Sequence, residues 1–356
     1  MASTIALISD AIPSMTQLRS LSLRDYNTDS LDQDIIPTLR SKSISHLILS
    51  NFKIRVDMPE LQSLVGNFST LTTLDECTQP TTLAKLKELI VLPYDMYMPE
   101  NISVAAIKSI FRRLTNIEKL KWRNTVNYEI FNAICDICTP LKELVIDYDL
   151  LYFNASNLNK LTHLRRLRPS CSSNALAESY SNKFIIDLSK LTLMEHIELP
   201  WDEGHTFKLP TSLKSLEVCI GNNNRENSIQ TIINCGAHLK ELKVVIQDYN
   251  PDDSDYEEPI ELLKALSSLK HLEILDFNGG LFQESSFLRM NAPLVRLHKL
   301  RFDMAKLQSS KPVRKIGGMS NAMLTFRGLK EKFPNLKKPE FSCCRLITGR
   351  RRSGSE

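Results

Sequence analysis

Glycine is scarce in this sequence, and its scarcity argues against the common nucleotide-binding loops. There are 11 glycines among 356 residues. Loops that hold phosphate groups need glycine at fixed positions, as in G-x-x-x-x-G-K-[ST] or G-x-G-x-x-G. Neither motif occurs, and the adjacent pairs Gly279-Gly280 and Gly317-Gly318 lack the lysine and hydroxyl residue of such a loop. We therefore expect no cofactor.

Long apolar runs and a strong charge imbalance are also lacking. No segment approaches the roughly 18 uncharged apolar residues of a transmembrane helix. The N-terminal MASTIALISDAIPSM lacks the basic start and unbroken apolar stretch of a signal peptide. A net charge of +4 is too small to indicate binding to nucleic acid or to a membrane surface. We expect a protein that binds neither and that works in the cytoplasm or the nucleus.

The cysteines are not clustered as in a disulfide-rich or zinc-binding domain. Eight cysteines are scattered along the chain, which is typical of reduced thiols in a cytosolic protein. Cys135 and Cys138 have the C-x-x-C spacing, but no second pair and no paired histidines lie near them in the sequence. We predict that both are small buried core residues and that the chain holds no metal.

The sequence does contain a short apolar phrase that recurs along its whole length. Two apolar residues three apart are followed by a third two positions later, as in Leu18-Leu21-Leu23 and Leu239-Leu242-Val244. The middle residues of all copies, weak ones included, stand at positions 21, 47, 74, 89, 120, 144, 167, 197, 216, 242, 275, 300 and 339. The mean step is about 26 residues, within the range of roughly 20–29 found in leucine-rich repeats.

This phrase predicts a stack of short parallel strands. The last two apolar residues are two apart, so they point to the same side of a strand. One repeat cannot bury them alone, but stacked repeats share a continuous core. We predict an α/β fold, a leucine-rich-repeat solenoid with a curved parallel sheet on its concave side and helices and turns on its convex side. It should span residues 1–346 in about 12–13 irregular repeats, followed by a disordered basic tail at 347–356. The step from 74 to 89 is short, and we leave open whether the phrase at 74 is a true strand.

Segments with helical periodicity lie between several phrases. Apolar residues fall along one stripe in each, which predicts a helix packed against the sheet. The stripes are Val104, Ile107, Ile110 and Phe111; Ile130, Phe131, Ile134 and Ile137; Ile229, Ile232 and Ile233; and Leu262, Leu263 and Leu266. Two charged stretches, the acid-rich 247–258 and the lysine- and arginine-containing 309–320, interrupt the rhythm and are predicted loops.

Two repeats resemble those of F-box leucine-rich-repeat proteins, in which a helix ends in cysteine shortly before the strand. Cys138-Thr139-Pro140-Leu141-Lys142-Glu143-Leu144 has this pattern, and Cys235-Gly236-Ala237-His238-Leu239 has it with one extra residue. The resemblance implies a protein–protein interaction scaffold that recognises substrates for an SCF-type ubiquitin ligase. An F-box would dock on the ligase adaptor, but no F-box is visible in this chain.

A rival likeness is to the repeat domain of immune or signalling receptors of the nucleotide-binding type. Strands followed by Leu-Pro, as at Leu199-Pro200 and Leu209-Pro210, are similar to repeats of those sensors. That likeness implies a sensor domain instead of a ligase component. A third class, a GTPase-activating repeat protein, has no specific residue in its favour.

The concave surface should display the residues that alternate with the buried pair of each strand. In the middle of the chain these are charged, in strands that alternate between basic and acidic. Complementary charge on such a surface suits the binding of a protein; the alternative is that the charges pair across strands on a solvated sheet. The candidate binding residues with their neighbouring aromatic side chains are Lys119, Lys121, Arg123, Asp147, Tyr148, Tyr152, Arg166, Arg168, His196 and Trp201.

The three aromatic residues in this set are predicted anchors on the rim, because Trp and Tyr are frequent in binding hot spots. The alternative is that they cover the ends of the strands. Trp122, in contrast, takes a core position of its phrase.

No arrangement of residues indicates catalysis. The histidines at 163, 238, 271 and 298 occupy spacer positions of different phrases, so they should lie on the surface rather than converge. We predict that the protein is not an enzyme.

Overall fold

The computed structural model describes a chain that divides into two compact units, Met1–Ala177 (unit 1) and Glu178–Glu356 (unit 2). The described residues are 2–24, 38–50, 54–67, 71, 83–92, 103–123, 128–147, 156–170, 185–199, 206–221, 224–236, 238–246, 259–283, 285–309, 329–337 and 339–348. The acid-rich stretch 247–258, nearly all of 309–320 and residues 349–356 of the predicted tail lie outside them.

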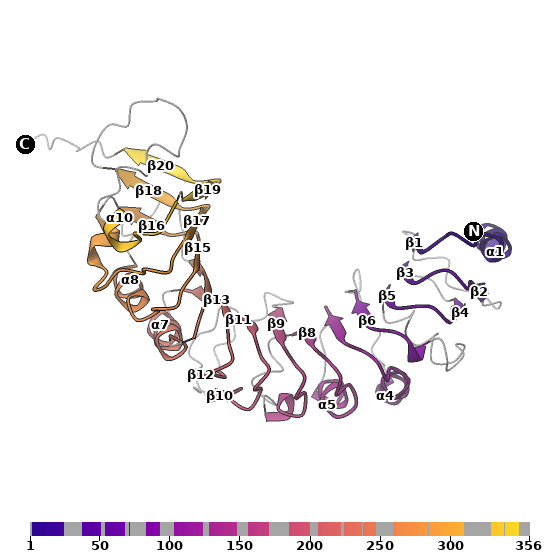
Figure 1. Cartoon of the computed structure of the whole chain (residues 1–356). Helices are drawn as coiled ribbons and strands as arrows, with labels where there is room; N and C mark the ends of the chain where they lie inside the picture. The colour runs from indigo at the N-terminus through magenta and orange to yellow at the C-terminus, as the bar shows by residue number, and fades with distance from the viewer. Residues whose placement is uncertain are drawn as a thin grey trace, which may run out of the picture. The chain divides into compact units, whose positions relative to one another are not determined.

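Unit 1 contains seven parallel strands in one sheet (Figure 1). In order across the sheet they are β1 (Ser20–Arg24), β3 (His46–Ser50), β5 (Ser63–Gly66), β6 (Glu88–Val91), β7 (Lys119–Trp122), β8 (Glu143–Asp147) and β9 (Arg166–Ser170). Their register places Leu21, Leu47, Leu64, Leu89, Leu120, Leu144 and Leu167 in one row. The predicted row of register leucines is confirmed except at one position.

That exception is the strand between β3 and β6. The spacing of the phrases offers Leu74 for this place, but β5 pairs with both neighbours and puts Leu64 in the row. Gly66 takes the position where the other phrases have a second apolar residue, so the pattern was hidden. Leu74 itself lies outside the described residues.

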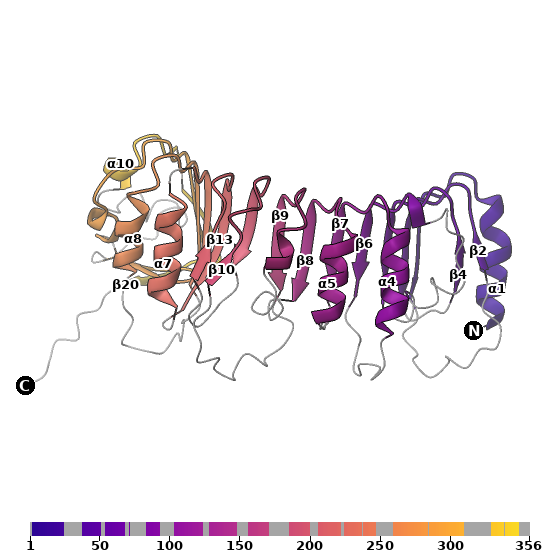
Figure 2. The ribbon, with the colours of Figure 1, turned by 90° about the horizontal axis from the view of Figure 1, so that it is seen from below.

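Helices cover one face of this sheet. Helix α4 (Val104–Arg113) begins after Ser103, whose hydroxyl accepts a hydrogen bond from the amide of Ala106 and caps the helix. Helix α5 (Tyr128–Ile137) follows β7, and both helices lie on the same side of the strands (Figure 2). Ile107, Ile110 and Phe111 of α4 are buried, as are Ile130, Phe131 and Ile134 of α5. The two predicted stripes therefore form the core against the sheet, where Phe111 meets Trp122 with ring centroids 6.0 Å apart.

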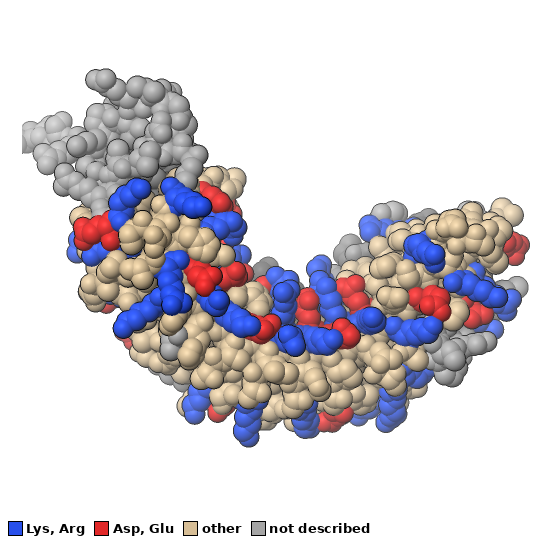
Figure 3. Space-filling view, in the orientation of Figure 1, with Lys and Arg blue, Asp and Glu red and all other residues tan. Residues whose placement is uncertain are grey.

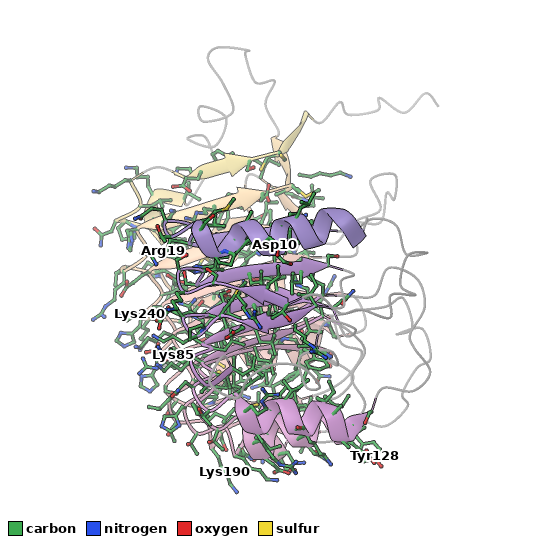
Figure 4. All side chains as sticks on the ribbon, turned by 90° about the vertical axis from the view of Figure 1, so that its right-hand side faces the viewer. Asp10, Arg19, Lys85, Tyr128, Lys190 and Lys240 are labelled. Atoms are coloured by element: carbon green, nitrogen blue, oxygen red, sulfur yellow. The ribbon has the colours of Figure 1, made fainter. Side chains whose placement is uncertain are left out.

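Hydrogen bonds at the edge where the strands begin tie each repeat to the next. The carbonyl oxygen of Gln62 accepts bonds from the amides of both Lys87 and Glu88, at 2.8 and 3.0 Å. The carbonyl of Lys87 does the same for the next strand. Arg19 and Lys85 lie along this edge, whereas Tyr128 lies at the opposite edge, at the start of α5 (Figure 4). The shared carbonyls keep the strands in the same register.

At the N-terminal end, α1 (Ala2–Ala11) and the 3-10 helix η1 (Ile12–Ser14) precede β1. A pair of short strands, β2 (Thr38–Arg40) and β4 (Arg55–Asp57), forms a separate small parallel sheet. Such strands were not predicted, because three residues are too few to show a periodic pattern.

Unit 2 repeats the arrangement with six parallel strands. They are β11 (His196–Leu199), β13 (Ser215–Ile220), β14 (Glu241–Ile246), β15 (Ile274–Asn278), β17 (Lys299–Asp303) and β19 (Glu340–Ser342). Helices α7 (Arg225–Asn234), α8 (Ile260–Leu266) and α10 (Leu329–Lys332), with the 3-10 helix η4 (Ser286–Arg289), lie between strands. Leu262, Leu263 and Leu266 are buried as predicted. In α7 the predicted Ile232 is buried, but the prediction was wrong at Ile233, which is 40% exposed; Thr231 faces inward beside Ile232.

Short strands outside the main sheet occur in several repeats of unit 2, and in two of these repeats η4 or α10 follows the short strand. They are β10 (Ile185–Asp187) with β12 (Thr206–Lys208), and β16 (Leu281–Gln283) with β18 (Lys306–Ser309) and β20 (Arg345–Thr348). The last three follow tight turns with left-handed backbone at Gly279 and Gly280, Met304 and Cys343. A cluster of phenylalanines fills the space beneath, with Phe277 stacked on Phe302 at 5.5 Å and Phe302 on Phe341 at 5.6 Å.

Each unit is a stretch of α/β solenoid of the leucine-rich-repeat type, with a parallel sheet on one side and helices or short strands on the other. Every helix within the described residues is too short or too polar to cross a bilayer. The extent of a single solenoid over 1–346 stays a prediction.

Candidate binding surface

The candidate surface is the face of each sheet that carries no helix among the described elements, which we call the open face (Figures 1 and 2). In each strand the side chain of the register residue points into the core, and the side chains of the residues just before and after it point to the open face. We call the residue before the register residue part of the first outer row, and the residue after it part of the second outer row. Because the strands share one register, each row crosses the sheet as a continuous line.

The first outer row of unit 1 contains a chain of charges. Lys119 Nζ lies 3.0 Å from Glu88 Oε1 and 3.7 Å from Glu143 Oε2. Glu88 Oε2 in turn accepts a hydrogen bond of 2.8 Å from the hydroxyl of Ser63. Lys121 of the second row lies 3.9 Å from Glu143 Oε1. These residues pair across strands, which is the arrangement given above as the alternative to partner binding for Lys119 and Lys121.

The pairing alters the protonation of these groups. Hydrogen bonding to Glu88 raises the pKa of Lys119 above its usual value. Burial lowers the pKa of Lys121, and the neighbouring Lys119 charge lowers it further. Burial opposes the ionisation of Glu88, but the hydrogen bonds from Lys119 and Ser63 outweigh it and lower its pKa. Glu88 was missed in the sequence because it belongs to a separate phrase, and only the strand register shows that it faces Lys119.

The other predicted residues divide by position. Arg123 is exposed after the end of β7, and Arg166 and Arg168 face outward on β9 beside Glu143 and Val145. His196 lies in unit 2, where Nδ1 is 2.9 Å from Ser215 Oγ and Nε2 is 3.2 Å from Glu198 Oε1. Tyr148, Tyr152 and Trp201 lie outside the described residues, and Asp147 ends β8 with its side chain also outside them. Their role in binding a partner stays a prediction.

The second outer row of unit 1 is apolar over three successive strands, a feature that was not predicted. Ile48, Val65 and Ile90 align across β3, β5 and β6. All three are half-buried. The signal was visible in the phrases Leu47-Ile48-Leu49 and Leu89-Ile90-Val91, where the spacer is as apolar as the core residues.

The second outer row of unit 2 is charged throughout. It runs Glu198, Glu217, Lys243, Asp276, Arg301 and Glu340. Lys243 Nζ is 2.8 Å from Glu217 Oε1, and Arg301 lies 2.9 Å from both Asp276 and Glu340. Basic and acidic side chains interleave over this unit (Figure 3).

The two cysteines of the C-x-x-C spacing are core residues, as predicted, whereas Cys343 is exposed. Cys135 and Cys138 are buried free thiols. Burial raises the pKa of each to about 12. Such thiols are poor nucleophiles and poor metal ligands near neutral pH. Among the described residues no group of His, Cys, Asp or Glu could hold a metal ion.

The predicted surface histidines are confirmed in position: His163, His238, His271 and His298 are all exposed, in four different repeats. Trp122, predicted to be a core residue, is fully buried.

Comparison with known proteins leaves the family of this chain unassigned. No family model matches the sequence, and no curated protein matches it. Among solved structures, one chain of the Rad7–Elc1 complex from yeast aligns over 100% of this chain and 86% of its own length, with 13% identity and a TM-score of 0.34. A protein from Bacteroides fragilis aligns over 75% of this chain and 68% of its own, with 12% identity and a TM-score of 0.31. Both TM-scores are too low to carry an argument about function.

Proposed function

We propose that this chain is a protein-binding scaffold and that its partner docks on the open face of unit 1. The observation that supports this most directly is the line of Ile48, Val65 and Ile90 beside the charges of Glu88 and Lys119. An apolar centre with a polar border is the usual composition of a protein interface.

The burial of the side chains indicates how much binding free energy the row of Ile48, Val65 and Ile90 can contribute. The inner leucines Leu47, Leu64 and Leu89 are at most 1% exposed, so the sheet does not need the outer row for its core. Apolar surface removed from water contributes about 25 cal/mol per Å². Three half-buried aliphatic side chains on adjacent strands therefore provide a contact that a partner can cover completely.

The more specific role is substrate recognition for an SCF-type ubiquitin ligase. Its support is the cysteine-ended helix before two strand phrases, at Cys138 and Cys235. Cys138 is buried between α5 and β8 in the structure. In this role the bound partner is the protein to be ubiquitylated.

Photo-crosslinking tests where the partner binds. A photoreactive phenylalanine analogue replaces Val65 on the open face or, as a control, the exposed Arg112 on α4. The full chain is expressed in cells and irradiated. We expect a discrete crosslinked protein at Val65 that is absent at Arg112. Equal labelling at both positions, or none at Val65, would contradict the proposed surface.

Charge reversal tests the predicted basic residues separately. Changing Lys121, Arg123, Arg166 and Arg168 together to glutamate should leave the circular dichroism spectrum unchanged. If these residues contribute, the Val65 crosslink falls by about tenfold, as loss of roughly 1.4 kcal/mol of binding free energy predicts. An unchanged crosslink would show that the apolar row binds without them.

The ligase role is tested on the crosslinked protein itself. Its cellular half-life should lengthen when this chain is depleted and when cullin activation is blocked. A half-life that does not change would refute the ligase role and leave the scaffold role standing.

A further inference from the structure

A cavity of about 370 Å³ opens on the open face of unit 2, over the last three strands β15, β17 and β19. Two sets of polar residues surround it. One is the end of the charged second outer row, and the other consists of the residues that end the three strands, aligned in register. The lining residues that matter are Lys243, Asp276, Arg301, Glu340, Asn278 and Asp303.

The cations in this lining already have carboxylate partners. Arg301 uses Nη1 for Asp276 Oδ2 and Nε for Glu340 Oε2, both at 2.9 Å. Lys243 Nζ is held by Glu217, at 2.8 Å from Oε1. An anionic ligand would have to compete with these pairs, so the cavity is poorly suited to phosphate or carboxylate.

Several hydrogen-bond acceptors of the lining, in contrast, have no donor. Asp276 Oδ1 has no hydrogen-bond partner, but it is covered by protein atoms and is therefore closed to a ligand. Among the residues described, the side chains of Asn278 and Asp303 also make no hydrogen bond, although both line the cavity. The cavity thus lacks donors, and positive charge in particular, since its lining has three acidic and two basic side chains.

Aromatic rings lie beneath the cavity, on the inner side of the sheet. Phe341 is half-buried and stacks on Phe302, which stacks on Phe277. Phe277 and Phe302 are each 1% exposed, so their rings support the strands from the core and are not accessible to a ligand.

We propose that this cavity receives the cationic end of a lysine or arginine side chain of a protein partner, with the carboxylate of Asp303 and the amide oxygen of Asn278 as its acceptors. The inference rests on the proposed scaffold function, because it supplies a second contact for a bound protein. It assigns a specificity: the partner segment over unit 2 carries a basic residue.

Short peptides test the cavity without the natural partner. The probes are acetyl-Ala-Arg-Ala-amide and its lysine, citrulline and glutamate counterparts, titrated against the full chain and followed by saturation-transfer NMR. We expect saturable binding of the arginine or lysine peptide, and binding of the citrulline peptide at least fivefold weaker. Whichever of the two basic peptides binds more tightly identifies the preferred side chain.

Two variants locate the binding. Asp303→Asn removes a cavity carboxylate and should weaken the basic peptide at least fivefold. Glu241→Gln removes the same charge from an exposed position of β14 on the same face, outside the cavity, and should leave binding unchanged.

Three results would overturn the proposal: no saturable binding of either basic peptide, equal binding of the citrulline peptide, or equal effects of the two variants. None of these depends on the crosslink at Val65 in unit 1. Failure of the cavity and failure of the scaffold role are therefore distinguishable.

Discussion

Units 1 and 2 share the same inner architecture and differ in what they show to solvent. In both, register leucines form a buried row, exemplified by Leu144 and Leu242. The second outer row of unit 1 carries Ile48, Val65 and Ile90, whereas that of unit 2 is a line of paired charges. The difference shows that packing constrains only the inner rows. The outer rows are free to vary, so they are the part of the repeat in which binding properties can differ between the units.

The two units also end their strands differently. Within the described residues, all positive φ angles of non-glycine and glycine residues fall in unit 2, in the turns after β15, β17 and β19. In unit 1, α4 and α5 follow β6 and β7 with no short strand among the described residues, whereas in unit 2 the short strands β16 and β18 precede η4 and α10. The segment after a strand can therefore differ while the leucine row stays the same.

The largest effect should come from the inner rows. Leu144→Ala in unit 1 and Leu242→Ala in unit 2 each remove a fully buried side chain, and each should cost about 2–5 kcal/mol in the free energy of unfolding. If the units are separate folding entities, hydrogen exchange should accelerate mainly in the strands of the mutated unit. Equal acceleration in both units for either variant would show one cooperative structure and break the comparison.

A smaller effect is expected at the turns of unit 2. A Cβ at Gly279 would lie 2.5 Å from the carbonyl oxygen of Ile246, and the residue has φ of +81°. Gly279→Ala should therefore destabilise the protein by about 1–3 kcal/mol, measured by urea denaturation. Met304 follows in the next repeat with φ of 52°, but its side chain is 61% exposed. Met304→Ala is the matched control and should be nearly neutral; similar losses for both would contradict the role of the close contact with Ile246.

The smallest effect concerns pH and the charges of unit 1. The pKa of Glu88 is lowered in the folded state, so its ionised form stabilises the fold above the ordinary pKa of 4.5. That contribution is lost as pH falls through the lowered folded pKa. Glu88→Gln should remove roughly 0.5 kcal/mol at neutral pH and flatten the acid limb of the stability curve.

Glu241→Gln is the control for this prediction in unit 2. Glu241 is exposed and makes no ion pair among the described residues, so its substitution removes no contact of the folded state. Urea midpoints between neutral and acid pH measure both variants. If the two curves coincide, the pairing of Glu88 with Lys119 contributes nothing measurable.

Much of the fold could be predicted because the inner rows follow a strict spacing. The phrases around Leu21, Leu120 and Leu275 identify strands, and the buried stripes of α4, α5 and α8 follow helical periodicity. The prediction missed β5, because Gly66 replaces an apolar residue and the nearby Leu71-Leu74 pair has the same spacing. It misplaced Ile233, since Ser228 and Thr231 fill the inner side of α7 with small polar residues that the apolar pattern ignores.

The binding surface was less predictable for a physical reason. Outer residues acquire their neighbours only through strand pairing, so the contacts of Glu88 with Lys119 and Ser63 appear only in three dimensions. The cavity over β15, β17 and β19 needs the alignment of Asn278 with Asp303, which are in different repeats. Sequence spacing alone carries no information on which of these groups lacks a partner.

The strands keep one register although the segments that connect them differ in length. The link from Leu47 to Leu64 is about half as long as the link from Leu242 to Leu275, and loop entropy grows only slowly with such additions. Neighbouring strands nevertheless align residue for residue in both places. Insertions and deletions between strands can therefore occur without disturbing the pairing of the strands. Segments grafted into these connections should be tolerated for the same reason.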